Sequence, residues 1–309
     1  MTDGERTSAA LTFPDQSRRV ASTTATELHA PGAPERTSPG ETSPGEKFTD
    51  DDAVDSIIAP VFDNTVEEGT RRLKRTWPGL LATGWVGGMD VGIGVLALAL
   101  VRQQTGSEVL GSLAFGIGFI FLLLASSELF TENFWVPIAA IVAGRSSVGA
   151  LVKLWVGTLV MNLVGGWVIM GIVVTGLPQL RPTLVELGHH FVTIGLGWQA
   201  LAAAVLGGGI ITLMTWMHHG TDSEPARLIA SVSAAFLLAA GSLNHAIVMS
   251  LEMFAALESG APFGYVAWAK AFGVALVGNI IGGVGFVTVL RLFQVGGTKI
   301  AQEREAAEA

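Results

Sequence analysis

The sequence contains no cysteine, and only 14% of its residues are charged. A chain without cysteine forms no disulfide, no cysteine-ligated zinc site and no thiol-based catalytic centre. The chain also lacks the HExxH and GxSxG motifs of metalloproteases and serine hydrolases, and it has no basic block of the kind that binds nucleic acid. We therefore expect neither an enzyme nor a nucleic-acid-binding protein, and these patterns indicate no cofactor and no bound metal.

Long apolar runs dominate the composition. Half of the 309 residues are hydrophobic, and the mean hydropathy is +0.53, which is typical of membrane proteins. The N-terminus lacks the apolar segment of a signal peptide, so the first span is expected to direct insertion. We expect an all-α membrane protein with six transmembrane helices, at about 77–101, 110–143, 148–175, 191–217, 228–257 and 263–293. Lysine and arginine concentrate on the side that holds both termini, so the positive-inside rule makes both termini cytoplasmic in a multi-pass protein of the inner or plasma membrane.

The chain divides into four parts. Residues 1–52 are rich in Pro, Gly, Ser, Thr and Glu and are expected to be a disordered tail. Residues 53–76 place apolar side chains on one helical face and charged ones on the other, which predicts an amphipathic helix lying on the membrane surface, its first turns weakened by Pro60. Residues 77–295 form the six-span domain, and residues 296–309 a cytoplasmic C-terminal tail.

A polar stretch interrupts the second span. Residues 126–134 include two glutamates, a threonine and an asparagine, and apolar runs flank them on both sides. A charge at the centre of a bilayer costs about 2.5–3.5 kcal/mol, so such residues face protein or water rather than lipid. A surface loop between two short helices is the alternative interpretation. A matching break in the fifth span, at residues 241–245, favours an interrupted helix in mid-membrane.

The two breaks belong to a longer internal repeat. Segments of the form Asn-x-x-Gly-Gly begin at Asn162 and at Asn279, and their separation nearly equals that of Ser127 and Ser242. Three spans followed by three equivalent ones cross the membrane in opposite senses, which gives an inverted 3+3 repeat with helices 2 and 5 broken. Transporters and channels of this construction carry their pathway between the broken helices.

These motifs resemble those of the formate/nitrite transporter family. The similar segments are, in chain order, Glu-Leu-Phe-Thr-Glu-Asn from Glu128, Asn-x-x-Gly-Gly from Asn162, Met-Thr-Trp-Met from Met214, Asn244-His245, and Asn-x-x-Gly-Gly from Asn279. The similarity covers roughly residues 54–295. Glu132 before Asn133 and the stretch from His245 to Glu252 are most similar to the YfdC-like branch of the family.

The resemblance implies an aquaporin-like protomer, assembled as a homopentamer with a separate pore in each subunit. Members of the family pass small monovalent anions of weak acids, such as formate, nitrite, hydrosulfide, acetate and lactate. The family pattern places Thr131 opposite His245 at the centre of the pore, with Asn244 beside the histidine. Apolar side chains narrow the pore on either side, and the matching positions are Leu129 and either Leu238 or Phe236. The rest of the first break would support the pore loop, through Glu128, Phe130, Glu132 and Asn133.

Two positions depart from the family pattern. Formate channels of the family usually carry Glu immediately before the central histidine, where this chain has Asn244. They also carry Asn eight residues before a Trp on the fourth span, where this chain has Gly208. The expected architecture is unchanged, but the substrate stays open, together with the choice between a channel and proton-linked transport.

Histidine suits the centre of such a pore because its unperturbed pKa, about 6.5, lies nearest physiological pH. His245 could donate a proton to a passing anion, or attract the anion where it is most costly to desolvate. A structural histidine, bonded to backbone or to a hydroxyl, is the alternative. The pairs His189-His190 and His218-His219 are expected at membrane surfaces rather than at a metal.

Other buried acids leave a competing function open. Asp90, in the middle of the first span, requires a partner such as a hydroxyl. Glu252 follows His245 on nearly the same helical face and is interpreted either as support or as outer pore lining. A cation or metal-ion transporter would use these two acids with Glu128, Glu132 and His245 as ligands.

Overall fold

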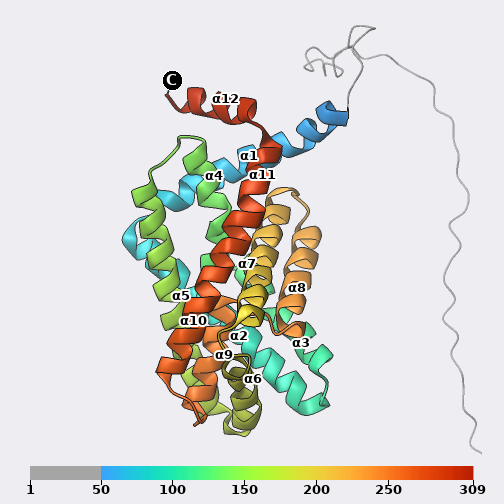
Figure 1. Ribbon diagram of the computed structural model, residues 1–309, viewed down its shortest axis with the longest axis vertical. Coiled ribbons are helices and arrows are strands. Elements are labelled where there is room, and N and C mark those ends of the chain that lie inside the picture. Colours follow the sequence, from blue (N-terminus) through green and yellow to red (C-terminus); the bar gives the residue numbers. More distant parts are fainter. Residues whose placement is uncertain (1–49, 309) are drawn as a thin grey trace, which may run out of the picture. The chain divides into compact units, whose positions relative to one another are not determined.

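The computed structural model describes residues 50–308 (Figure 1). These residues form helices and turns, with no strand among them. The tail predicted for residues 1–52 lies almost wholly outside the described residues. In chain order the helices are α1 (Asp50–Leu73), α2 (Trp77–Thr105), α3 (Glu108–Leu124), η1 (Phe130–Phe134), α4 (Val136–Val142), α5 (Val148–Gly176), η2 (Pro178–Leu180), α6 (Arg181–Thr193), α7 (Trp198–His219), α8 (Glu224–Ala240), α9 (Ala246–Glu258), α10 (Tyr265–Ile280), η3 (Ile281–Thr288), α11 (Val289–Val295) and α12 (Gly297–Glu308).

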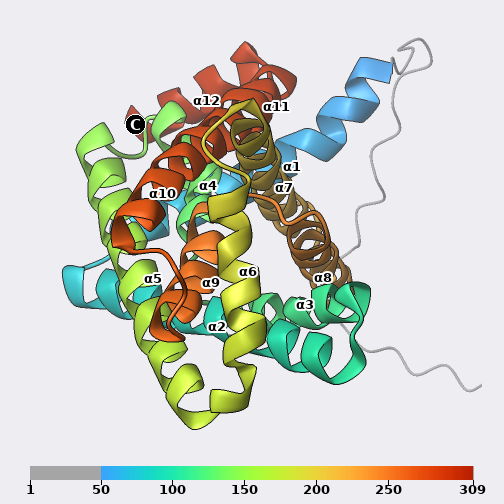
Figure 2. The ribbon, with the colours of Figure 1, turned by 60° about the horizontal axis from the view of Figure 1, so that its bottom comes forward.

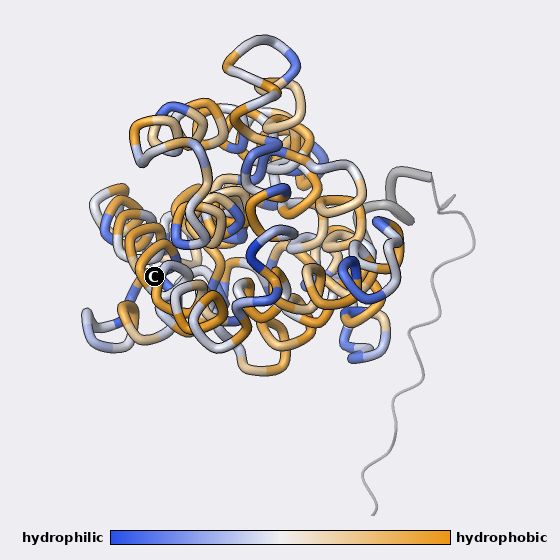
Figure 3. Tube along the Cα trace, turned by 90° about the horizontal axis from the view of Figure 1, so that it is seen from below, coloured by the Kyte–Doolittle hydropathy of each residue, from blue (hydrophilic) through white to orange (hydrophobic). Residues whose placement is uncertain are grey.

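Four helical segments are long and apolar enough to cross a bilayer. They are α2, α5, α7 and the continuous segment Tyr265–Val295, in which the π-helical turn η3 joins α10 to α11. These segments correspond to the first, third, fourth and sixth predicted spans. Hydrophobic residues follow much of the helical trace in Figure 3, as helices that face lipid require.

The second and fifth predicted spans each contain two shorter helices with non-helical residues between them. Helix α3 ends at Leu124 and η1 begins at Phe130, while α8 ends at Ala240 and α9 begins at Ala246. Ser126 and Ser242 follow the two helix ends with φ angles of 53° and 44°, and they are the non-glycine residues with positive φ in the described chain. A left-handed residue at each place turns the chain out of the helix. Helices α3 and α8 pack against each other (Figure 2).

Three helices differ from the sequence-based expectation. The fourth span begins at Trp198 rather than near residue 191, because a separate helix, α6, ends at Thr193. Helix α1 continues through Pro60, and residues 297–308 of the expected C-terminal tail form α12. Helices α1, α4 and α12 gather at one end of the described chain and α6 lies at the other (Figure 1).

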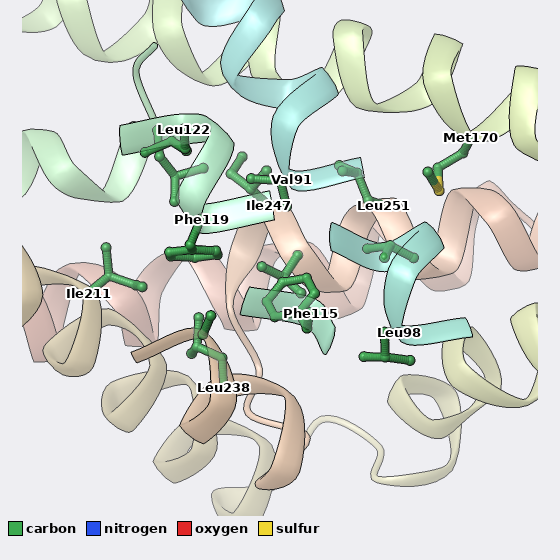
Figure 4. Packing of buried hydrophobic residues seen from close by; sticks show 14 of the residues in the cluster. Val91, Leu98, Phe115, Phe119, Leu122, Met170, Ile211, Leu238, Ile247 and Leu251 are labelled. Carbon is green, nitrogen blue, oxygen red and sulfur yellow. The ribbon is translucent and has the colours of Figure 1, made fainter. Parts of the chain in front are cut away.

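The main hydrophobic core lies where helices α2, α3, α7, α8 and α9 meet. Phe115 and Phe119 of α3 are completely or almost completely buried, with ring centroids 5.6 Å apart. Figure 4 shows Leu238 and Ile211 beside Phe119, and the same cluster continues to α2 and α9. The core therefore joins elements from both halves of the chain.

Glycines let two equivalent helix pairs approach closely. A Cβ atom on Gly88 of α2 would lie 2.2 Å from the carbonyl oxygen of Asn162 on α5. A Cβ atom on Gly208 of α7 would lie 2.2 Å from the carbonyl oxygen of Asn279 on α10. Real side chains do not fit at such distances, so both crossings depend on glycine. Small residues at helix crossings let helix backbones approach closely within a membrane.

Candidate functional site

Two asparagines hold the non-helical segments in place by the same set of hydrogen bonds. The Asn162 side chain accepts from the backbone N–H of Phe130 at 2.8 Å and donates to the carbonyls of Gly84 and Glu128 at 2.7 and 2.8 Å. The Asn279 side chain accepts from the backbone N–H of Ala246 at 2.8 Å and donates to two carbonyls in the equivalent way, those of Ala204 and Asn244, at 2.8 and 3.0 Å. Backbone that leaves a helix inside a membrane needs such partners, because lipid supplies none. The two Asn-x-x-Gly-Gly segments of the sequence therefore make equivalent sets of hydrogen bonds.

Thr131 and His245 bring the two non-helical segments together. The Oγ1 atom of Thr131 lies 2.7 Å from Nε2 of His245, and both residues are fully buried. The backbone N–H of Val248 donates to Nδ1 of His245 at 3.3 Å, so the imidazole caps the N-terminus of α9. Since Nδ1 accepts, the neutral ring carries its proton on Nε2 and donates it to Thr131. The threonine hydroxyl can then donate its own hydrogen to a passing group.

Polar cavities lie on opposite sides of this pair. The α1 cavity, about 520 Å³, is lined on the Thr131 side by Ser127, Glu128 and Glu132, together with arginines of α1. The α6 cavity, about 340 Å³, is lined on the His245 side by Ser242, Val248 and Glu252, together with residues of α6. Neither Thr131 nor His245 lines either of these two cavities. The pair thus occupies a closed zone between two water-accessible spaces.

The closed zone is apolar apart from this pair and its backbone supports. Leu129 is completely buried and belongs to the same core cluster as Phe115 and Phe119. Leu238 belongs to the cluster as well and also lines the α6 cavity. Phe236 is half-buried and lies outside the cluster. Of the two alternatives weighed for the second narrow point, Leu238 is thus the one that contacts both the core and a cavity.

Arginines at the end of α1 neutralise the first glutamate of the pore loop. Glu128 is almost fully buried, with Nη1 of Arg75 2.6 Å and Nε of Arg72 3.3 Å from its Oε1 atom. Arg72 also pairs with Glu68, one turn earlier on α1, at 2.8 Å. Burial alone would lower the pKa of Arg72, but the negative charges of Glu128, Glu132 and Glu68 raise it. The Glu128 carboxyl group does not exclude an anion from this cavity, because two cations lie beside it.

The other residues of the loop are held by different contacts. Glu132 accepts from the backbone N–H of Leu129 at 3.4 Å, which is a contact within the loop itself. Phe130 packs edge-on against Trp155 of α5, whose Nε1 donates to the carbonyl of Asn133 at 2.9 Å. The Asn133 side chain accepts from Arg72 at 3.2 Å. These contacts tie the loop to α1 and α5.

A family model for formate/nitrite transporters matches residues 59–293. The chain belongs to the formate/nitrite transporter family. It is a helical membrane transporter or channel of that family.

Several relatives of this formate/nitrite transporter are known. It is 26% identical to the inner membrane protein YfdC of Escherichia coli over 286 residues, which cover 87% of this chain and 90% of the relative. It is 25% identical to the formate channel BtFdhC of Bacillus thuringiensis over 244 residues, which cover 72% of this chain and 89% of that one.

Solved structures share the fold. An "FNT family ion channel" superposes with a TM-score of 0.65 at 16% identity and covers 75% of this chain and 98% of its own. A "pentameric formate channel with formate bound" superposes with a TM-score of 0.58 at 19% identity and covers 70% and 96%.

The two departures of this transporter from the family pattern have different surroundings. The Asn244 side chain donates to the carbonyl of Ala200 at 3.4 Å, and its Oδ1 atom is buried without a hydrogen-bond partner. Gly208 lies against the backbone of Asn279, where a larger residue would separate α7 from α10. Gly208 is thus required by this helix crossing, whereas Asn244 places an unpaired acceptor next to His245.

Sequence reasoning missed the partners that come from α1. Arg72 and Arg75 fall within residues 53–76, for which the sequence predicts only an amphipathic helix on the membrane surface, whereas their side chains reach the pore loop. The signal available was a run of arginines directly before the first span. The partner expected for Asp90 is present, because the Ser127 hydroxyl donates to its carboxylate at 2.5 Å.

The acidic and histidine residues that a metal-ion transporter would use do not form a cluster. Within residues 50–308, no three His, Asp or Glu side chains lie close enough to hold a metal ion. His189 and His190 line the α6 cavity, and His218 and His219 line the α1 cavity.

Proposed function

We propose that this chain carries a small monovalent weak-acid anion of the formate/nitrite type across the membrane, through the Thr131–His245 pair. The observation that carries the proposal is the 2.7 Å contact of these residues in a buried apolar zone between two polar cavities. An anion in such a zone loses water, and the loss is costly unless a donor or a proton replaces it. The Thr131 hydroxyl, with its oxygen occupied by His245, is placed to give that hydrogen bond.

The architecture we propose is six spans in an inverted 3+3 repeat, aquaporin-like, with helices 2 and 5 interrupted. The matched bonds of Asn162 and Asn279, and the matched φ angles of Ser126 and Ser242, support it. Leu129 and Leu238 are the constrictions on either side of the pair, and Phe236 is not needed. Asn244 supplies a neutral acceptor beside His245.

The α1 cavity faces the cytoplasm in this proposal, and both termini lie on that side. The basic end of α1, the positive charge of Arg145 and the α12 lysine support this orientation. Helix α1 buries Phe62 and Val66 against Trp135 and Val136 of the loop region, and we propose that its charged face lies at the membrane surface. The α6 cavity then opens to the outside.

We further propose a homopentamer. One structure with this fold is a pentameric formate channel, and large apolar side chains exposed on α3, α5 and α10 leave surface for helix contacts. Mass measurement of the purified protein in mild detergent is expected to give five chains. A stable monomer or dimer as the main species would contradict the assembly.

Flux measurements in liposomes test the transport proposal. Purified protein is reconstituted, and uptake of formate, nitrite, acetate, lactate and hydrosulfide is compared with uptake of monovalent and divalent cations, with and without a pH gradient. We expect uptake that depends on the anion and is indifferent to the cation, above that of empty liposomes. Cation-selective uptake would support the competing function instead, for which the pairing of Glu128 with two arginines is unfavourable.

A further inference from the structure

The hydrogen bonds of His245 leave the pathway without a ready proton donor at its centre. Nδ1 already accepts from Val248, and the single proton on Nε2 is given to Thr131 in a hydrogen bond. A second proton on Nδ1 would break the helix cap, and it would place a positive charge at the positive end of the α9 dipole. The neutral ring is therefore the stable form, and loss of its one proton would leave an anionic imidazolate. A proton that neutralises the transported anion has to come from another group.

Glu252 is the group in the right place. It is only 6% exposed, and what is exposed of it lines the α6 cavity. Within residues 50–308, no hydrogen bond or ion pair joins its carboxyl group to another residue. A carboxylate so enclosed and unpaired is costly, whereas the carboxylic acid is not. The protonated carboxyl group of Glu252 therefore faces the α6 cavity.

The helix aligns this proton with the pathway. Seven residues separate His245 from Glu252, which is two turns of α9, so the two positions lie on nearly the same face about 10 Å apart. Val248 lies between them on that face, lines the cavity and belongs to the apolar core. An anion moving along α9 would meet Glu252 first, then the apolar side chain, then the Thr131–His245 pair.

Other charged groups around the cavity are already paired or lie in water. The charged and titratable residues that line it from neighbouring helices are Arg102, Glu108, Glu186, His189 and His190. Arg102 of α2 pairs with Glu108 of α3 at 3.0 Å and with Glu186 of α6 at 2.8 Å, and both glutamates are largely exposed. Helices α5 and α10, which also pack on α9, contribute no charged residue to the lining. Glu252 is therefore the buried acid that a ligand in this cavity contacts.

We propose that Glu252 is the proton-donating residue of the pathway, which gives its proton to the anion in the α6 cavity before the anion enters the closed zone. The O–H bond of the Glu252 carboxyl breaks, and the same proton forms a bond to the anion, which becomes the neutral acid. The negative charge stays on the Glu252 carboxylate, which, unlike His245, faces the water of the α6 cavity. The neutral acid passes the Thr131–His245 pair and loses its proton to water in the α1 cavity. The Glu252 carboxylate then regains a proton from water in the α6 cavity, so each cycle moves one anion with one proton. This inference rests on the proposed function.

The test compares Glu252→Gln, Glu252→Asp and Glu108→Gln in liposomes that contain a pH-sensitive dye. Gln keeps the size of the side chain and removes the acidic proton. We expect Glu252→Gln to lower formate uptake at least about tenfold at pH 7 and to flatten its pH dependence. Glu252→Asp should retain the wild-type shape of the pH profile at a lower rate. Glu108→Gln, which removes an exposed acid of the same cavity, should match the wild type.

Two outcomes separate the inference from the function on which it rests. If Glu252→Gln keeps the rate and pH profile of the wild type, Glu252 is not the donor, although formate transport stands. If wild-type protein moves formate no faster than empty liposomes, the proposed function itself fails.

A second measurement needs no variant. A hydrophobic carbodiimide modifies protonated carboxyl groups, so wild-type protein should be labelled at Glu252, as mass spectrometry of its peptides can show, and formate should slow the labelling. An unlabelled Glu252 beside labelled carboxyls elsewhere would overturn the proposal.

Discussion

Replacing Thr131 by valine tests the centre of the pathway with the smallest possible change. Valine has the shape of threonine but no hydroxyl, so the substitution removes the acceptor of the His245 Nε2–H and the donor offered to the substrate. Both residues are fully buried, so water does not readily replace either bond. The apolar walls around them stay as they are.

The structure sets the size of the expected effects. A buried donor left without its acceptor costs about 1–3 kcal/mol, which lowers the stability of the folded protein by that amount. An oxygen of the permeating acid that enters this buried zone without the Thr131 donor loses about 1–3 kcal/mol as well, and each 1.4 kcal/mol is a factor of ten in rate. Formate flux through Thr131→Val should therefore fall about ten- to a hundredfold.

The assay is stopped-flow formate uptake into liposomes, with Thr158→Val as the matched control. Thr158 of α5 is also fully buried, but its hydroxyl has no hydrogen-bond partner, so its loss should leave flux unchanged and stability equal or higher. Wild-type flux in a well-folded Thr131→Val protein would refute the reasoning, and an equal loss in the control would show that the effect is not specific.

Three further predictions concern packing and charge. Leu129→Ala should raise the uptake of lactate relative to formate, because the substitution widens a hydrophobic constriction. It should also lower the stability of the folded protein by about 2–5 kcal/mol. An unchanged ratio of lactate to formate uptake would show that Leu129 does not line the pore. Gly208→Ala should lower the thermal unfolding temperature, because its Cβ would lie 2.2 Å from a backbone oxygen. Gly209→Ala should not, because the nearest atom to its Cβ would be 3.8 Å away. Equal effects of the two substitutions would contradict the close contact of α7 with α10 at Gly208. Burial raises the pKa of Glu68, but the charges of Arg72 and Arg71 lower it more, to below its ordinary value of 4.5, so the stabilisation is present above pH 4.5 and is lost as the pH falls further. Glu68→Gln should thus destabilise the protein at pH 7 and have little effect in acid, as thermal unfolding at both pH values can show.

Four of the six predicted spans, the first, third, fourth and sixth, match helical segments long enough to cross a bilayer, because hydrophobic length is a local signal. The breaks at residues 126–134 and 241–245 coincide with the ends of α3 and α8. The family relation followed from the segments around Glu128 and Asn279 and is confirmed by the family match over residues 59–293.

What could not be predicted depends on contacts between distant parts of the chain. The pairing of Arg75 with Glu128 joins the connection between α1 and α2 to the pore loop, and no periodicity in either segment indicates it. Helix α6 was missed because its polar and apolar residues resemble a loop followed by the start of a span. Which nitrogen of His245 carries the proton was open for a similar reason. It depends on the hydrogen bond that the backbone N–H of Val248 donates to Nδ1, and this bond exists only once α9 has formed.

The most direct test of the central claim is the proton movement that accompanies formate. Liposomes with purified protein and a pH-sensitive dye are mixed with formate at equal internal and external pH, and empty liposomes report the unassisted permeation of formic acid. If the chain carries formate together with a proton, the lumen acidifies faster than in empty liposomes, and Thr131→Val slows that acidification about ten- to a hundredfold. Acidification at the rate of empty liposomes would contradict the account.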